Sequence, residues 1–249
     1  MKRLSVIILF ILTNYSNGQD TLRHKKLYVG AFLSPDCSYR VLPNNTGTAA
    51  TVSHVRDLIE IPRFAYTLGL DFLYQPFKRI ALSLGIQYSL KGEQTKNTVY
   101  SYGTVQPRRG FQSIPFPTNG YFIYNDNYID IPISANFSFK SKTKTSFFIM
   151  AGISTNIFLS EKVVSEQTYS TGNKVISSKN GSSGYYKINS QLQLGCGFDI
   201  NIKKNKLRIY PIGRISILPV NSGPVNGYFY SIGLGVSYLF QVHNSFFNN

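Results

Sequence analysis

The sequence has no tryptophan, only two cysteines and few charged residues. Charged side chains make up 15% of the 249 residues, and acids are the scarcest, with 11 Asp and Glu against 26 Lys and Arg. Two cysteines cannot cross-link a chain of this length, which excludes a disulfide-rich scaffold. Sparse charge together with 43% hydrophobic residues excludes a disordered chain, a collagen and a coiled coil. The length suits one domain or two small ones.

Long apolar runs are also missing. A transmembrane helix needs about 20 consecutive apolar residues. The most apolar stretches here, such as 146–160, are interrupted by Ser, Thr, Asn and Gly. This pattern excludes a helical membrane protein, but it does not exclude a membrane protein built from strands.

The N-terminal segment has the pattern of an export signal. A positively charged start is followed by the apolar run Leu4–Leu12 and then by the small residues Ser16 and Gly18, two positions apart. This order predicts a signal peptide over residues 1–18. We therefore expect an exported protein with a single domain over residues 19–249.

Apolar and polar residues alternate with a period of two along most of that domain. Between residues 187 and 200, Leu192 and Leu194 fall on one face, whereas Gln191 and Gln193 fall on the other. Such a period is the signature of a β-strand. The same pattern predicts eight strands, which cover residues 26–40, 64–75, 80–91, 129–139, 146–160, 187–200, 207–218 and 228–240.

The predicted connections are alternately short and long. Three short turns separate long loops over residues 41–62, 92–123, 161–185 and 219–227. This is typical of an all-β, antiparallel, up-and-down barrel of the outer membrane, whose short turns face the periplasm. With eight strands, both ends of the barrel lie on that periplasmic side.

A water-soluble barrel is the alternative architecture. Its apolar face would point inward and its outer face would be charged. The apolar faces here carry large Ile, Leu, Phe and Tyr, and the opposite faces are rich in Gly, Ser, Asn and Gln. Small polar residues suit the narrow interior of an eight-stranded barrel. We therefore favour the membrane barrel, with apolar side chains facing lipid and polar ones inside.

Several segments resemble a known family in their order and spacing. They are Leu33–Arg40 with its Ser-Pro-Asp-x-x-Tyr-Arg pattern, Ile61–Leu70, Gly85–Gly92 and Tyr128–Ile133. Together they are similar to PorT-like outer-membrane β-barrel proteins, over about residues 26–240. The resemblance implies an eight-stranded outer-membrane barrel, and it implies no particular activity.

The last predicted strand ends in a pattern typical of outer-membrane barrels. Gly235, Tyr238 and Phe240 resemble the terminal signal that the barrel-insertion machinery reads, which makes that machinery an expected partner. The residues after it, 241–249, depart from this pattern, because such signals usually close the chain.

Polar residues with long or charged side chains fall on the predicted inner face. They are Asp71, Lys91, Asp130, Lys187, Asp199, Arg208 and Arg214. Two interpretations remain open. These residues either line a path for an ion or small solute, or form a plug of ion pairs, since charges away from bulk water must be paired.

Other candidate chemistry is thin. His54, Asp57 and Glu60 are spaced by three, yet no further His or Cys supports a metal site. Cys37 and Cys196 are expected near the end and in the middle of different strands, which favours free thiols over a disulfide. No motif of a hydrolase or a phosphate-binding loop is present, so we expect no catalysis and no cofactor.

The basic excess is concentrated in the short turns. Eight basic residues lie there with no acid among them: Lys78, Arg79, Lys140, Lys142, Lys144, Lys203, Lys204 and Lys206. These residues either hold anionic headgroups or periplasmic polymers, or are ordinary solvated turn residues. The basic residues do not gather on an aromatic face, which argues against nucleic acid as a partner.

The sequence thus predicts a monomeric barrel embedded in outer-membrane lipid, with its activity in the loops. The second long loop is unusually aromatic, with Tyr100, Tyr102, Phe111, Phe116, Tyr121 and Tyr124. We expect a structural or surface-interaction role with an extracellular ligand or protein. The alternatives are a narrow channel for small solutes and an accessory component of a secretion system.

Overall fold

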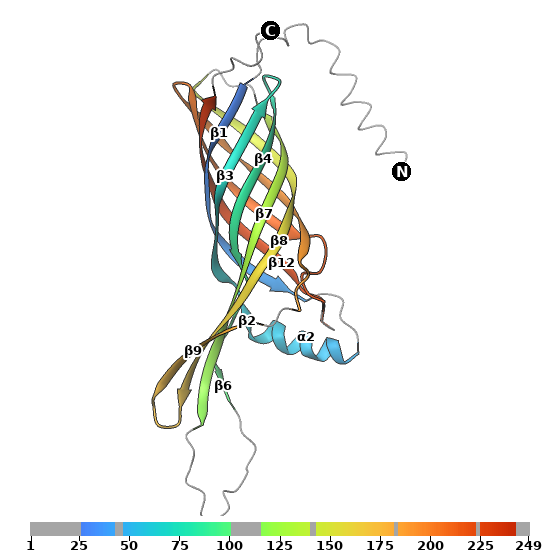
Figure 1. Ribbon diagram of the computed structural model, residues 1–249, viewed down its shortest axis with the longest axis vertical. Coiled ribbons are helices and arrows are strands. Elements are labelled where there is room, and N and C mark those ends of the chain that lie inside the picture. Colours follow the sequence, from blue (N-terminus) through green and yellow to red (C-terminus); the bar gives the residue numbers. More distant parts are fainter. Residues whose placement is uncertain are drawn as a thin grey trace, which may run out of the picture.

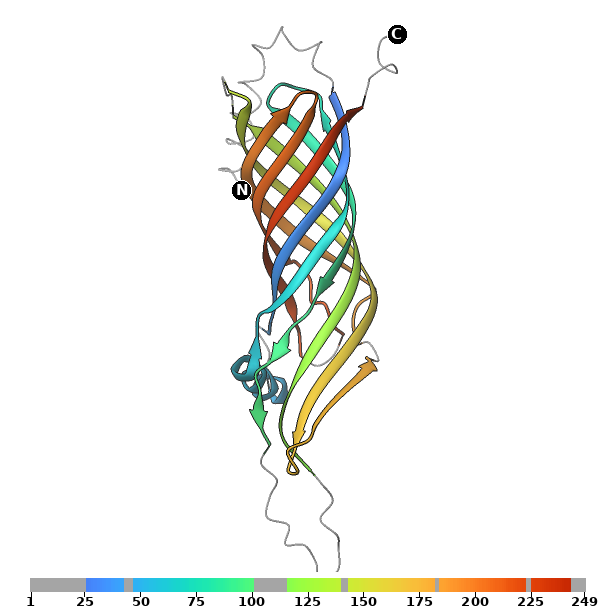
Figure 2. The same cartoon turned by 90° about the vertical axis from the view of Figure 1, so that its left-hand side faces the viewer.

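The molecule is a closed antiparallel β-barrel that extends into a projecting sheet at one end (Figure 1, Figure 2). The computed structural model describes residues 26–42, 47–100, 116–139, 143–181, 184–222 and 225–242. The predicted signal peptide and residues 243–249 of the C-terminal segment lie outside these ranges.

Eight long strands form the barrel wall. Each pairs with its neighbour in the chain, and the first pairs with the last, so the ring is closed. The wall strands are β1 (Lys26–Val41), β3 (Arg63–Gln75), β4 (Ile80–Lys91), β7 (Pro117–Ser138), β8 (Thr145–Tyr169), β10 (Ile188–Ile202), β11 (Asn205–Ser216) and β12 (Tyr228–Val242). All eight predicted strands and the up-and-down order are confirmed.

The start of β1 and the end of β12 lie at the same end of the barrel, which we call the terminal end; the opposite end is the distal end. The turns β3–β4 and β10–β11 join their strands at the terminal end, where the end of β7 and the start of β8 also lie. The remaining described elements lie at the distal end: helix α2 (Thr48–Ile59) and the short strands β2 (Glu60–Ile61), β5 (Gln94–Thr95), β6 (Thr98–Val99) and β9 (Lys174–Asn180).

The outer face of the wall is apolar and the inner face is largely polar. Leu70 and Leu194 are half exposed on the outside, at 52% and 50%, whereas Gln191 and Gln193 inside are exposed by only 1% and 5%. This orientation is the one predicted for a membrane barrel and rules out the soluble alternative, in which the apolar face would be the buried one.

Aromatic side chains mark both borders of the apolar band. At the terminal end, Phe139, Phe147 and Phe198 follow one another around the outside with ring centroids 5.5 and 5.6 Å apart. Towards the distal end, the rings of Tyr66 and Tyr88 lie 6.3 Å apart on neighbouring strands. Such girdles are typical of barrels at the two lipid–water interfaces.

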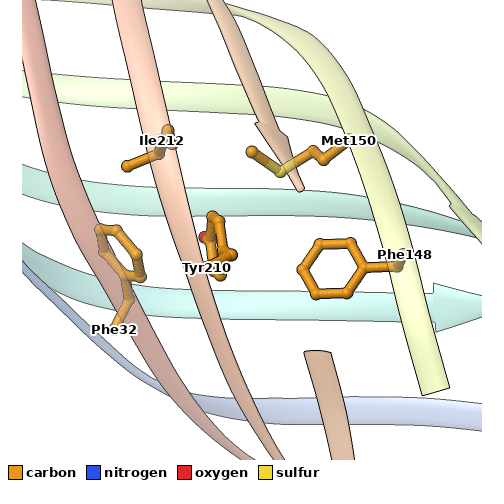
Figure 3. Packing of buried hydrophobic residues seen from close by; sticks show 5 residues of the cluster. All are labelled: Phe32, Phe148, Met150, Tyr210 and Ile212. Atoms are coloured by element: carbon orange, nitrogen blue, oxygen red, sulfur yellow. The ribbon is translucent and has the colours of Figure 1, made fainter. Parts of the chain in front are cut away.

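The interior is less uniformly polar than the sequence predicts. Five inward-facing side chains, Phe32, Phe148, Met150, Tyr210 and Ile212, pack against one another across the lumen (Figure 3). The sequence predicts polar side chains inside the barrel, and this layer of apolar and aromatic side chains departs from that prediction. A narrow lumen must be filled, and aromatic rings fill it without requiring further charged partners.

Three of the predicted long loops contain regular structure. Residues 117–123 and 161–169, assigned to loops from the sequence, continue β7 and β8 beyond the other strands, and β9 pairs with β8 as a third strand. The loop over 41–62 contains α2. No helix in the described ranges, α2 included, is long and apolar enough to cross a bilayer.

The closing pair of the barrel requires glycine at one position. A Cβ atom at Gly30 of β1 would lie 1.9 Å from the carbonyl oxygen of Tyr238 on β12. At Gly213, on β11, an added Cβ would meet no atom within 4 Å.

We therefore expect Gly30→Ala to destabilise the barrel, because the closing strands must move apart. The free energy of unfolding should fall by about 1–3 kcal/mol, as for an overpacked core. The matched control Gly213→Ala should change it little. Urea unfolding in lipid vesicles, followed by the mobility difference between unheated and heated samples on gels, measures both. Equal stability of the two variants would contradict the close approach of β1 and β12.

Candidate functional site

The structure places six of the seven candidate inner residues on the lumen side of the wall: Asp71, Lys91, Asp130, Asp199, Arg208 and Arg214. Lys187 is the exception and a correction. It precedes β10 at the distal end and is exposed, because the strand that would turn it inward begins one residue later.

One charged cluster lies in the lumen near the terminal end. Arg208 holds Asp199 through two hydrogen bonds of 2.8 and 3.2 Å, and its third nitrogen donates to Asn136 at 2.8 Å. Lys206 Nζ lies 3.2 Å from the same carboxylate. The Arg208 guanidinium stacks 4.0 Å from the centre of the Phe148 ring, so the charged cluster borders directly on the apolar layer.

A second charged cluster lies beyond the apolar layer and contains two ion pairs. In the first, Arg214 lies 2.9 Å from Asp36, and both side chains are almost fully buried. Asp36 also accepts hydrogen bonds from Ser34 and Thr67 at 2.6 and 2.7 Å.

In the second pair, Lys91 lies 3.0 Å from Asp130 and donates to Gln191 at 3.1 Å. Asp130 also accepts hydrogen bonds from Ser89 and Asn156. Each charge in the cluster therefore has an opposite charge, as buried ions require. Asp36, Asp130 and Lys91 also have further hydrogen-bond partners.

Asp71 is held differently from the other inner acids. Its carboxylate accepts hydrogen bonds from Gln87 at 2.9 Å and from Ser237 at 3.0 Å. It lines an internal cavity of about 20 Å³ beside Arg208, Tyr210 and Arg214. A volume of this size accommodates about one water molecule. Charged clusters and apolar layers therefore fill the lumen at this level.

A third charged group lies towards the distal end and was missed by the sequence reasoning. Arg40 Nη2 lies 2.5 Å from Glu60 and 2.9 Å from Glu93, and the two carboxylates are almost fully buried. Asp126 lies in the same region with 0% exposure. Alternation along β1 places Arg40 inside, but its partners come from segments interpreted as loops, where alternation gives no information.

The remaining sequence candidates do not come together as sites. His54 and Asp57 are exposed on α2, whereas Glu60 turns inward to Arg40. No group of three or more potential metal ligands occurs in the described ranges. Cys37 and Cys196 are free thiols on β1 and β10, as favoured from the sequence.

The proposed insertion signal has a defined geometry. Tyr238 and Phe240 lie near the terminal end of β12 with ring centroids 4.9 Å apart. Gly235 faces the lumen, where an added Cβ would lie 2.8 Å from the Tyr210 ring. Recognition by the insertion machinery remains a prediction.

Comparison with known proteins finds a family and several similar folds. The model of the family described as outer membrane protein beta-barrel domain matches residues 9–217. Neisserial surface protein A is 11% identical, with a TM-score of 0.45, covering 85% of this chain and 95% of that protein.

Outer membrane protein OprG from Pseudomonas aeruginosa is 10% identical, with a TM-score of 0.45 and coverage of 88% and 96%. The outer membrane protease OmpT from Escherichia coli is 9% identical, with a TM-score of 0.38 and coverage of 88% and 96%. A search of curated proteins finds no match.

The Asp36–Arg214 pair allows a test of the inner network. Arg214→Ala should lower the free energy of unfolding by about 3–5 kcal/mol, because it leaves a buried carboxylate without its opposite charge. Asp36→Asn combined with Arg214→Met should recover most of that loss. Lys174→Ala, which breaks an exposed 3.5 Å pair with Glu166, should cost less than about 0.5 kcal/mol. Urea unfolding in vesicles measures all three, and equal effects would contradict a buried pair.

Glu93 should make barrel stability dependent on pH. It lies beyond the end of β4, and burial raises the pKa of its carboxyl to about 7 despite the opposing charge of Arg40. The pKa of this carboxyl in the unfolded chain is 4.5. Between pH 4.5 and 7 the folded state therefore binds more protons than the unfolded state. The contribution of Glu93 to stability should therefore be greatest below about pH 4.5 and fall by up to about 3 kcal/mol as the pH rises from there to above 7. Glu93→Gln should flatten this part of the profile; an unchanged slope in unfolding measurements from pH 5 to 8 would contradict it.

Proposed function

Since the chain belongs to the family of outer membrane protein β-barrel domains, we propose that it is a monomeric surface-interaction barrel without catalytic activity. Its wall anchors it in outer-membrane lipid, and its distal end faces outward, because both ends of an even-stranded barrel lie on the periplasmic side. In this proposal, the projecting sheet at the distal end contacts an extracellular ligand or protein.

The observation that carries the proposal is the free edge of β9. Among the residues that the structure describes, this strand pairs with β8 along one side only, and all seven of its residues are exposed. Val175 and Ile176 are exposed by 45% and 70%, far from the lipid-facing band. An unpaired, exposed strand edge is the structure to which an extended segment of a partner adds as a further strand.

The filled lumen supports interaction rather than transport. A solute passing along the axis would have to displace the paired charges around Asp199 and Asp130 and the aromatic layer between them. The aromatic residues predicted as a contact surface are described only in part. Of these, Tyr121 lies on the projecting part of β7 and donates a hydrogen bond to Glu166 of β8 at 2.7 Å.

A photo-reactive amino acid at position 176 tests the proposed contact in intact cells. We expect a discrete cross-linked product of the full-length protein, because Ile176 lies at the free edge. Position 192 is the matched control, since Leu192 faces lipid on the barrel wall and should give no protein product. A second control combines Glu166→Ala with the photo-reactive residue at position 176. This substitution leaves the outer edge of β9 unchanged, so the cross-linked product should be retained.

Three other outcomes would contradict the proposed surface interaction. If position 176 gives no product that position 192 lacks, the surface-interaction proposal is wrong. Stepwise conductance of the purified protein in planar bilayers would favour the channel alternative. A cross-linked periplasmic partner in place of an extracellular one would favour a component of a secretion system.

A further inference from the structure

The terminal mouth of the barrel forms a blind polar cup that the surface role does not use. Its volume is about 420 Å³. The lumen strands contribute Lys26 and Lys206, and the β3–β4 turn contributes Lys78 and Arg79. The other polar residues of its lining are the hydroxyl and amide side chains of Tyr28, Gln75, Ser138, Thr143, Ser146 and Asn201. No carboxylate belongs to the described lining.

The floor of the cup is electropositive. Lys206 was interpreted from the sequence as a turn residue, but it begins the inward face of β11 and is buried. It shares the single carboxylate of Asp199 with Arg208, so two positive charges face one negative charge. Its Nζ also lies over the Tyr28 ring, 5.0 Å from the ring centre, and Tyr28 lines the cup too.

The cationic turn is held in place by hydrogen bonds. Gln75 Nε2 donates to the carbonyl of Lys78 at 3.1 Å, and the Ser138 amide donates to the carbonyl of Arg79 at 2.7 Å. Both contacts fix the backbone and leave the two cationic side chains exposed at the rim. A turn whose backbone is already fixed loses less conformational entropy on binding.

Below the floor the lumen is closed by apolar packing. Tyr28, Leu73, Ala81 and Leu239 form a buried cluster directly beneath the cup. A ligand that enters from the terminal end therefore cannot continue through the barrel. The cup has the form of a binding site and not of a pore entrance.

We propose that this cup binds an oxyanion with two or more negative charges on the periplasmic side, of phosphate-type chemistry. Clustered Lys and Arg side chains with neutral hydrogen-bond donors are the groups that recognise phosphate oxygens. The phosphate belongs either to a soluble periplasmic molecule or to a lipid headgroup that reaches over the rim.

The test measures binding of inorganic pyrophosphate by calorimetry to the full-length protein in discs of phosphatidylcholine. We expect saturable binding that Lys78→Gln combined with Arg79→Gln weakens at least tenfold. Lys203→Gln combined with Lys204→Gln is the matched control. It removes the same charge from another turn at the terminal end. Lys203 and Lys204 do not line the cup, so the affinity should change less than twofold. Heat-dependent gel mobility confirms that each variant is folded.

Discs that also contain phosphatidylglycerol distinguish the two sources. If pyrophosphate binds the unmodified protein equally in both kinds of disc, the cup takes a soluble ligand. If phosphatidylglycerol suppresses that binding, the headgroup is the occupant. Absence of saturable binding in phosphatidylcholine discs would overturn the proposal. So would equal weakening by the two double variants, because the effect would then be that of overall charge.

Discussion

A strand that crosses hydrocarbon must find a partner for every backbone N–H and C=O within the protein. In this chain the requirement is met by pairing β1 with β12, which leaves no free edge in the lipid-facing part of the sheet. Ring closure then fixes which side chains face lipid and which face inward. The alternation of the sequence, the aromatic girdles and the polar lumen all follow from that one condition.

Closure also creates an interior that has to be filled, and the chain fills it in layers. Paired charges around Asp199 are followed by the aromatic layer of Phe148 and Tyr210, and then by the pairs of Asp36 and Asp130. Burying this many charges is unfavourable unless each is matched. The match between Asp36 and Arg214 joins strands far apart in the chain, so this ion pair also makes the ring specific for one arrangement of strands.

The sequence was most informative where one face meets lipid. Strands such as β4 alternate cleanly because Leu84 and Ile86 face hydrocarbon while Gln87 faces the lumen. Outside the membrane that contrast disappears, and the signal disappears with it. The distal parts of β7 and β8 and the helix α2 were therefore interpreted as loops, although each is regular structure.

For the candidate site, alternation identified which side chains face inward but not which of them meet. The partnership of Asp36 with Arg214 spans 178 positions and depends on the tilt and stagger of the strands. Lys187 was assigned inward by extending the pattern one residue beyond β10. The cup at the terminal mouth combines turn residues with lumen residues, and no local pattern in the sequence links the two.

The unusual length of the β7–β8 pair has a mechanical consequence. At about 3.3 Å per residue, the 25 residues of β8 have a contour length of about 80 Å, and crossing a core of about 30 Å at about 45° uses roughly half of it. The two strands stay paired from Pro117 to Ser138. A pulling force on the tip along the strands is therefore shared as shear by many hydrogen bonds at once, and this part of the molecule transmits tension to the membrane without unzipping.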